Sequence, residues 1–270
     1  MSGPTRQASG VADELQRISA DVDGALRSFV DRQPVSDFYD LTRYHFGWQA
    51  GSAPPFRPRS VLCILACQAC GGSSEAALPL AVAVALLHEF SVNQRELELH
   101  QATSRGRPSV WNVWGTAQAM NAGDGMHALA KVALLEARAT LPAGSILHLQ
   151  AELDECCLRI CDAVQQELTA GEAASPELAA CKSAVLFELA AYGGCYIAGA
   201  GSAASARLRR LGELLGSAAA VQPLDAGRAL ALQREALALA GELPAQVRPQ
   251  VRALAEELLS AGADLPAGSY

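Results

Sequence analysis

The sequence predicts an all-α protein, and three observations lead to this fold class. Half of the 270 residues are apolar, and much of that share is Ala and Leu, which are strong helix formers. Aromatic residues, which favour strands, make up only 5% of the chain. Apolar residues also recur at helical spacing, as they do from Val11 to Arg32. We find no long Pro/Gly linker and no fixed repeat, so we expect a single domain.

The elements of the first half are bounded by Pro and Gly. We expect residues 1–10 to be disordered and a first helix to end before Pro34. A short aromatic helix follows and closes at Gly47, and a Pro/Gly/Ser loop covers residues 51–58. A further helix ends at Gly71-Gly72, and a long helix comes next. The predicted helices of this half cover residues 11–32, 38–47, 60–69 and 75–98.

The second half continues as helices separated by short turns. Residues 108–114 are expected to form a turn that leads into a helix rich in small residues. Ser175 is a predicted N-cap, with Pro176 at the first helical position. Gly193-Gly194 is predicted to interrupt the helical pattern, and the domain extends over residues 11–262, followed by a tail at 263–270. The remaining predicted helices cover residues 127–141, 146–169, 176–190, 206–220, 229–241 and 246–260.

Charge and hydropathy narrow the classes of function. The net charge is −7 and the sequence pI is about 5.3, which argues against an electrostatic nucleic-acid binder. The N-terminus lacks the pattern of a signal peptide. The most apolar segment, residues 76–87, is shorter than the roughly 20 apolar residues that a membrane span needs. We therefore expect a cytoplasmic protein without a membrane span.

The eight cysteines are expected to be free thiols in a reducing cytosol. Cys63, Cys67 and Cys70 share a helical face, and this spacing could suggest a metal site. Without a second CxxC pair, core packing is the better interpretation of these three cysteines. The same interpretation applies to a second group, in which Asp154 and Glu155 lie beside Cys156, Cys157 and Cys161.

Residues 86–124 are where we look for chemistry. An apolar helix turns polar at Asn93 and breaks at the loop of residues 104–108. Such a polar patch is costly unless it faces water or a ligand. Glu96 and His100 would share a helical face, and Glu98 adds a further carboxylate, so a weak metal site and a solvated polar face are the two alternatives.

A second candidate region lies upstream, before the predicted helix at 60–69. Arg57 and Arg59 stand at a helix N-terminus, where the helix dipole and free N–H groups also favour an anion. The alternative is a pair of solvated surface arginines. His88 lies on the apolar helix, where a histidine is commonly a satisfied core residue.

The phrases LLHEFS, RGRPSVWNVWG and AQAMNAGD resemble the trans-isoprenyl diphosphate synthases, or polyprenyl synthetases. The resemblance implies an all-α bundle of the isoprenoid synthase (class I terpenoid synthase-like) type. In that family an aspartate-rich DDxxD motif between the first two phrases binds magnesium, whereas residues 95–99 here read RELEL. A second aspartate-rich motif would follow residues 208–216. This chain has Gln222-Pro223-Leu224 there, with Asp225 out of register, and resembles a member shortened near the C-terminus.

The resemblance also implies roles for basic residues. Arg57 and Arg59 fall on the two arginines of a phrase that binds the diphosphate of isopentenyl diphosphate. His88 and Arg105 match positions that hold the same group. Lys182 lies in CKSAVLFELAA, which is similar to a motif whose lysine contacts the allylic diphosphate.

Three hypotheses follow. The first is a degenerate polyprenyl-synthetase-like protein that lacks ordinary chain elongation, binds a prenyl diphosphate, and forms a homodimer or a heteromer with an active synthase. The second is a divergent terpene synthase or prenyltransferase, with Glu96, Glu98 and His100 as candidate catalytic groups and magnesium only in this case. The third is a structural scaffold without a ligand.

Overall fold

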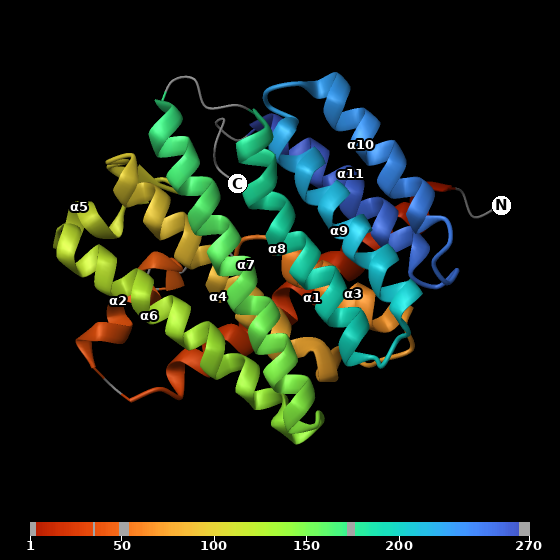
Figure 1. The fold of residues 1–270 in the computed structure, drawn as a ribbon, viewed down its shortest axis with the longest axis horizontal. Helices are drawn as coiled ribbons and strands as arrows, with labels where there is room; N and C mark the ends of the chain where they lie inside the picture. The colour runs from red at the N-terminus through yellow and green to blue at the C-terminus, as the bar shows by residue number, and fades with distance from the viewer. Residues whose placement is uncertain (1–3, 35, 49–53, 172–175, 265–270) are drawn as a thin grey trace.

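The structure is a computed structural model that describes residues 4–34, 36–48, 54–171 and 176–264, and over these residues the fold is all-α (Figure 1). The predicted fold class is confirmed. A short hairpin of β1 (Thr103–Ser104) and β2 (Arg107–Pro108) and a 3-10 helix at Glu136–Ala139 are the additions. The α-helices are α1 (Pro4–Asp31), α2 (Asp37–His45), α3 (Pro58–Ala69), α4 (Ser74–Glu98), α5 (Val110–Trp114), α6 (Thr116–Leu135), α7 (Ala143–Ala170), α8 (Pro176–Ile197), α9 (Ser202–Val221), α10 (Ala226–Ala240) and α11 (Arg248–Asp264).

Most predicted boundaries lie within a few residues of the observed ones, but the start of α6 and the two ends of the chain differ more. α6 runs without a break from Thr116 to Leu135, so the separate helix predicted at 127–141 is wrong, and the predicted turn at 108–114 contains the short helix α5. The first helix begins at Pro4 and not at Val11, so residues 4–10 are helical where disorder was predicted. Proline suits a first helical turn, because its fixed φ is already helical and its missing N–H would have no intrahelical partner. α11 extends to Asp264, two residues into the predicted tail. Residues 1–3, 265–270 and the predicted N-cap Ser175 lie outside the described residues.

Helix α4 is the centre of the core. It contacts α1, α3, α6 and α8, and Leu80, Leu86 and Leu87 on it are fully buried. By length and composition α4 could cross a membrane, so the argument that the apolar segment is too short was wrong. However, 61% of its most apolar window is buried inside the bundle. Burial in the core therefore accounts for the apolar composition of the first part of α4.

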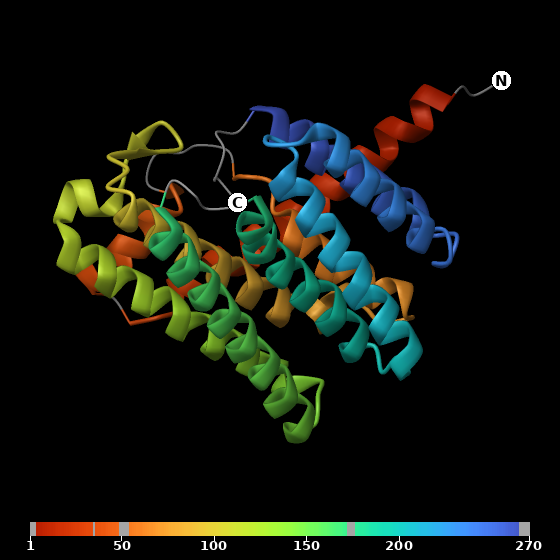
Figure 2. The same cartoon turned by 45° about the horizontal axis from the view of Figure 1, so that its top comes forward.

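Glycines set the distance of α8 from α3 and from α9, and α8, α9 and α10 lie in this order beside one another in Figures 1 and 2. α8 continues through Gly193 and Gly194, so the predicted interruption there is wrong. A Cβ on Gly194 would collide with the carbonyl oxygen of Cys63 on α3, and a Cβ on Gly212 of α9 would collide with the carbonyl oxygen of Phe187 on α8. These glycines permit close helix packing.

The cysteines divide between the core and the surface. Cys63, Cys67, Cys156 and Cys157 are buried in the core, as the packing interpretation predicts. Burial raises the pKa of the Cys67 thiol to about 11. Cys161 is exposed, which corrects its assignment to the core.

Replacement of Gly212 by alanine tests the packing of α8 on α9. Gly212→Ala should lower the free energy of unfolding by about 1–3 kcal/mol, because the added methyl overpacks two backbones. Gly24→Ala is the matched control, since nothing lies within 4 Å of a Cβ there in helix α1. It should stabilise by roughly 0.5–1 kcal/mol. Urea denaturation measures both, and effects of the same sign would contradict the packing argument.

Candidate functional site

A buried carboxylate, Glu89 on α4, organises the polar residues around it. One of its oxygens, Oε2, accepts from His45 Nε2 at 3.1 Å and pairs with Arg105 Nη1 at 2.9 Å. The other, Oε1, accepts from Arg105 Nη2 at 3.2 Å and from Arg57 Nη1 at 3.4 Å. The residue is only 1% exposed. Arg105 therefore grips Glu89 with a two-pronged fork, the strong geometry for a carboxylate.

The partners of Glu89 come from three elements besides α4. His45 is the last residue of α2, and Arg57 is the N-cap of α3. Arg57 also donates to Asp23 on α1 through its Nε at 3.0 Å, so the buried guanidinium is held from two sides. Arg105 lies in the hairpin turn with a φ of 50°, next to Gly106, and positive φ at both positions suits a type I′ turn. One carboxylate thus ties α2, α3 and the hairpin to α4.

Charge and burial oppose each other in this cluster. Burial alone would raise the pKa of Glu89, but Arg105 and His45 hold it well below its usual range, so Glu89 is ionised. The neighbouring His88 behaves differently, since burial and the charge of Arg59 hold its pKa well below the usual value. His88 is therefore neutral at pH 7, and its Nε2 accepts from Arg59 Nη1 at 3.4 Å.

A small cavity of about 60 Å³ lies beside Glu89. Its lining includes Arg57, Arg59, His88 and Arg105, so the structure brings together four of the predicted site residues. Glu89 also lines this cavity, and the sequence reasoning missed it. The position of Glu89 within an apolar stretch of the sequence could have identified it, because a charge that is buried in the core needs partners.

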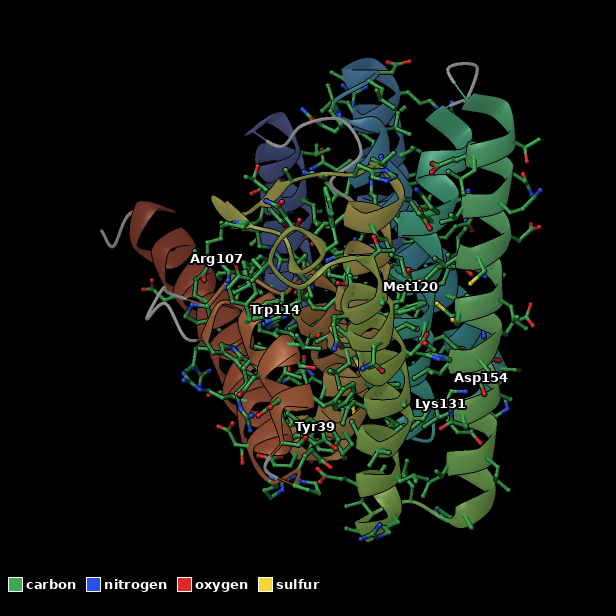
Figure 3. The ribbon with its side chains drawn as sticks, turned by 90° about the vertical axis from the view of Figure 1, so that its left-hand side faces the viewer. Tyr39, Arg107, Trp114, Met120, Lys131 and Asp154 are labelled. Carbon is green, nitrogen blue, oxygen red and sulfur yellow. The ribbon has the colours of Figure 1, made fainter. Side chains whose placement is uncertain are left out.

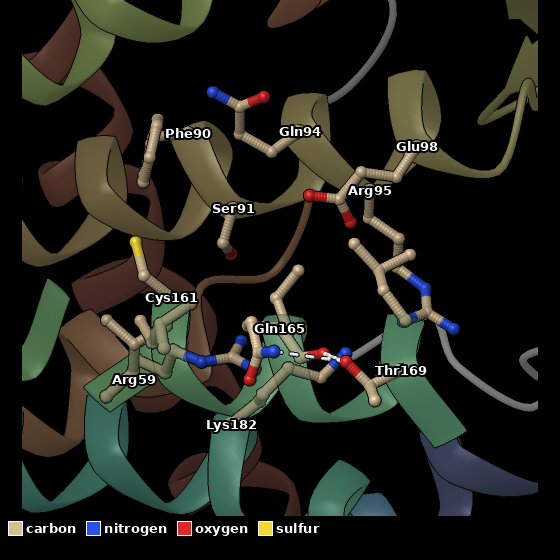
Figure 4. Close-up of a pocket in the computed structure, with 14 residues that line it drawn as sticks. Arg59, Phe90, Ser91, Gln94, Arg95, Glu98, Cys161, Gln165, Thr169 and Lys182 are labelled. Atoms are coloured by element: carbon tan, nitrogen blue, oxygen red, sulfur yellow. Dashed lines mark hydrogen bonds between the residues drawn. The ribbon is translucent and has the colours of Figure 1, made fainter. Parts of the chain in front are cut away.

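A larger pocket of about 540 Å³ lies between α4 and the pair α7 and α8 (Figure 4). Arg59 lines this pocket as well as the small cavity, and its guanidinium lies 4.8 Å from the centre of the Phe187 ring. The apolar part of the lining consists of Phe90, Ile160, Val164, Leu168 and Leu186. The polar part consists of Ser91, Gln94, Arg95, Glu98, Gln165, Thr169 and Lys182, and the thiol of Cys161 completes the lining.

Arg95, Lys182 and Glu98 line the polar end of this pocket, and Glu167, which is not in the lining, pairs with both cations. Glu167 on α7 accepts from Lys182 of α8 and lies 3.5 Å from Arg95 Nη1 of α4. Burial lowers the pKa of Lys182, although the hydrogen bond to Glu167 opposes this effect. Burial raises the pKa of Glu98, against the charges of Lys182 and Arg95. The large pocket is therefore an apolar chamber with a charged end.

The three candidate catalytic residues are not brought together. Glu98 lines the large pocket. Glu96 is buried and lies 4.0 Å from His45 Nδ1, where it lines a different, small cavity. His100 is exposed beyond the end of α4, with a φ of 50° and its ring 5.7 Å from that of Trp111. The prediction that Glu96 and His100 share a helical face is wrong, because α4 ends at Glu98.

The residues in the first aspartate-rich slot do not fit magnesium, which prefers several oxygen ligands in octahedral geometry. Arg95 brings a positive charge to the pocket, Glu96 lines another cavity, and Leu99 is 55% exposed. Within the described residues, no group of three or more His, Cys, Asp or Glu side chains could hold a metal ion. At the second slot, Asp225 accepts from Arg228 N at 2.9 Å and caps α10.

This bundle, with a long apolar pocket charged at one end, has the fold of solved isoprenoid synthases. A polyprenyl synthetase from Streptomyces coelicolor A3(2) superposes with a TM-score of 0.79 at 22% identity, over 92% of this chain and 99% of that one. A deletion mutant of the heterotetrameric geranyl pyrophosphate synthase of mint gives a TM-score of 0.73 at 18% identity, over 90% of this chain and 98% of that one.

Sequence comparison goes further than the fold. Residues 53–222 match the polyprenyl synthetase family, and the chain belongs to that family. A geranylgeranyl diphosphate synthase of Mycobacterium tuberculosis is 33% identical over 219 residues, which is 76% of this chain. The match spans 61% of the length of that relative. The family predicted from the sequence is confirmed.

The buried pairs of Glu89 give a pH-dependent prediction. Glu89→Gln should lower the free energy of unfolding by about 3–5 kcal/mol at pH 7, because Arg57 loses a buried counter-charge. Because the folded pKa is depressed, the stabilisation is present above the unfolded value of about 4.3 and is lost as the pH falls through the folded pKa. The difference in free energy of unfolding between the wild type and Glu89→Gln should therefore shrink as the pH falls. Denaturant titrations of both proteins between pH 7 and pH 3 measure this difference.

A control separates this buried effect from surface charge. Glu136→Gln breaks an exposed pair with Arg32 and should cost at most about 1 kcal/mol. A Glu89→Gln effect as small as that of Glu136→Gln, or one that does not change with pH, would contradict the assignment.

Proposed function

We propose that this chain binds an allylic prenyl diphosphate in the large pocket without carrying out ordinary magnesium-dependent chain elongation, and that it serves as a non-catalytic subunit in cytoplasmic isoprenoid metabolism. The observation that carries this proposal is the presence of Arg95 and Lys182 at the charged end of an apolar chamber. A hydrocarbon chain suits the apolar lining. Guanidinium and ammonium groups suit the phosphate oxygens.

The residues present favour binding over chemistry. Departure of diphosphate from an allylic carbon develops negative charge, which a metal ion ordinarily neutralises along with basic side chains. Arg95 and Lys182 supply part of that charge, and Glu167 already neutralises some of it. Without a fitting set of metal ligands, the transition state loses several kcal/mol of stabilisation while ground-state binding remains.

A second candidate is a divergent terpene synthase or prenyltransferase, and one observation favours it. Glu98 faces the large pocket with its pKa raised by burial. A carboxyl group of this kind is a suitable proton donor for general acid catalysis. In this case Glu98 would protonate a bound substrate, and Glu96 and His100 would have no part because they lie elsewhere.

Helices α5 and α6 carry the exposed apolar side chains to which we assign the proposed protein partner. Trp114 and Met120 are large apolar side chains that are 40% and 52% exposed on the face shown in Figure 3. Exposed apolar groups that cluster on one face are typical of protein interfaces. We assign this face to a second copy of the chain or to an active synthase, as the mint relative is a heteromer.

A binding experiment tests the proposed ligand. Titration calorimetry with geranyl, farnesyl and geranylgeranyl diphosphates in EDTA should show binding of at least one of them. Lys182→Ala should weaken it about tenfold or more, which corresponds to about 1.4 kcal/mol. Lys131→Ala, which removes a surface pair with Asp154, is the matched control and should leave the affinity unchanged. Formation of product from isopentenyl diphosphate in the presence of magnesium would refute the non-catalytic assignment.

Light scattering tests the partner face. Met120→Asp should reduce the assembled fraction of the chain, alone or mixed with an active prenyl synthase, because it places a charge on the apolar face. Leu230→Asp on α10 is the control, since Leu230 is 45% exposed on a different element. Equal effects of the two substitutions would count against an interface on α5 and α6.

A further inference from the structure

We propose that Glu89 is a built-in anion that occupies the hydrogen-bond donors of the small cavity beside α4, so that the chain accepts one diphosphate ligand and excludes a second. The one accepted ligand is that of the proposed function, on which this part of the inference rests. Three arginines, Arg57, Arg59 and Arg105, line this cavity, and the guanidiniums of Arg57 and Arg105 both contact Glu89. By its chemistry the cavity is an anion site, and the chain itself supplies the anion.

The contacts of Glu89 are those that a ligand would need. Arg105 presents both of its terminal nitrogens to the carboxylate, at 2.9 and 3.2 Å. Carboxylate and phosphate oxygens accept this same fork, so Glu89 and a diphosphate would compete for one set of donors. Both Glu89 oxygens already accept two donors each, from Arg57, His45 and Arg105.

Displacement of Glu89 by a ligand is unfavourable. The side chain is fully buried on a core helix, and the cavity beside it measures only about 60 Å³. A ligand that took Arg105 would leave a buried carboxylate without that partner, which is strongly destabilising. The large pocket measures about 540 Å³, and Glu167, which pairs with its two cations, is not among the residues that line it.

One further donor marks the cavity as an anion site. His88 is neutral and accepts from Arg59 through Nε2, so its Nδ1 carries the proton. This nitrogen is buried and has no hydrogen-bond partner among the described residues. A phosphate oxygen would satisfy His88 Nδ1 once the Glu89 carboxylate is removed.

The cavity should survive removal of the carboxylate. Arg107 donates to the carbonyl oxygens of Tyr44 at 2.7 Å and His45 at 3.2 Å, and Tyr44 Oη donates to the Pro108 carbonyl oxygen at 2.8 Å. These bonds hold the hairpin in place independently of Glu89. Arg57 likewise keeps its pair with Asp23.

Calorimetry with inorganic pyrophosphate in EDTA tests the proposal. Wild-type protein should bind at most one pyrophosphate. Glu89→Ala should gain one site, and the wild type should show no second site at pyrophosphate concentrations up to tenfold above the Kd of the gained site. The gained site should persist in Glu89→Ala/Lys182→Ala, which lacks the cation of the large pocket, and disappear in Glu89→Ala/Arg105→Ala.

Controls keep the outcome decisive. Asp23→Asn also removes a buried partner of Arg57 but leaves Glu89 in place, so it should gain no site. If Glu89→Ala does not fold, pyrophosphate should raise the unfolding temperature of the isosteric Glu89→Gln more than that of the wild type. A second site in the wild type, a folded Glu89→Ala without a new site, or a Glu89→Gln without the added shift would overturn the proposal. If the wild type binds no pyrophosphate while Glu89→Ala still gains its site, the proposed function is refuted and the inference about Glu89 is not.

Discussion

The buried ion pairs of Glu89 are the constraint on which the arrangement of the site depends. A carboxylate in a core helix is tolerated only with partners, and its partners come from α2, the start of α3 and the hairpin. These three elements must therefore be placed together. The small cavity lies where α3, α4 and the hairpin meet. Arg59 lines both this cavity and the large pocket, so it connects the small cavity to the larger one.

Under the proposed function, the large pocket would separate binding from catalysis within one fold. A metal ion is recruited from solution by carboxylates, whereas the guanidinium of Arg95 is covalently part of the chain. The fixed guanidinium attracts an anionic head group. Magnesium has octahedral coordination and exchangeable ligands, so it can contact a departing diphosphate from more directions than the guanidinium can. Glu167 further limits Arg95 and Lys182, because it holds both. The charged end is therefore better suited to holding a ligand than to ionising it.

The sequence predicted what depends on local pattern. Composition and apolar spacing predicted α4 within one residue of its observed start, and the resemblance predicted the basic residues of the small cavity. Tertiary contacts account for the failures. Gly194 was predicted to interrupt a helix because glycine has a low helix propensity, but in the fold it lies within α8, against α3. His100 does not share a helical face with Glu96, because the chain leaves the helix after Glu98 and turns toward the hairpin. Glu89 was overlooked because its partners lie 16 to 44 residues away along the chain.

The close glycine contacts of α8 have a consequence for how this chain can evolve. Side chains such as Arg95 and Leu99 border a pocket or solvent, so substitution there changes chemistry at little cost to folding. At Gly194 and Gly212 any side chain meets another backbone, so drift there is penalised whatever the function is. A lineage released from catalysis would therefore lose its metal ligands long before its architecture. The fold would outlast the reaction for which it was first selected.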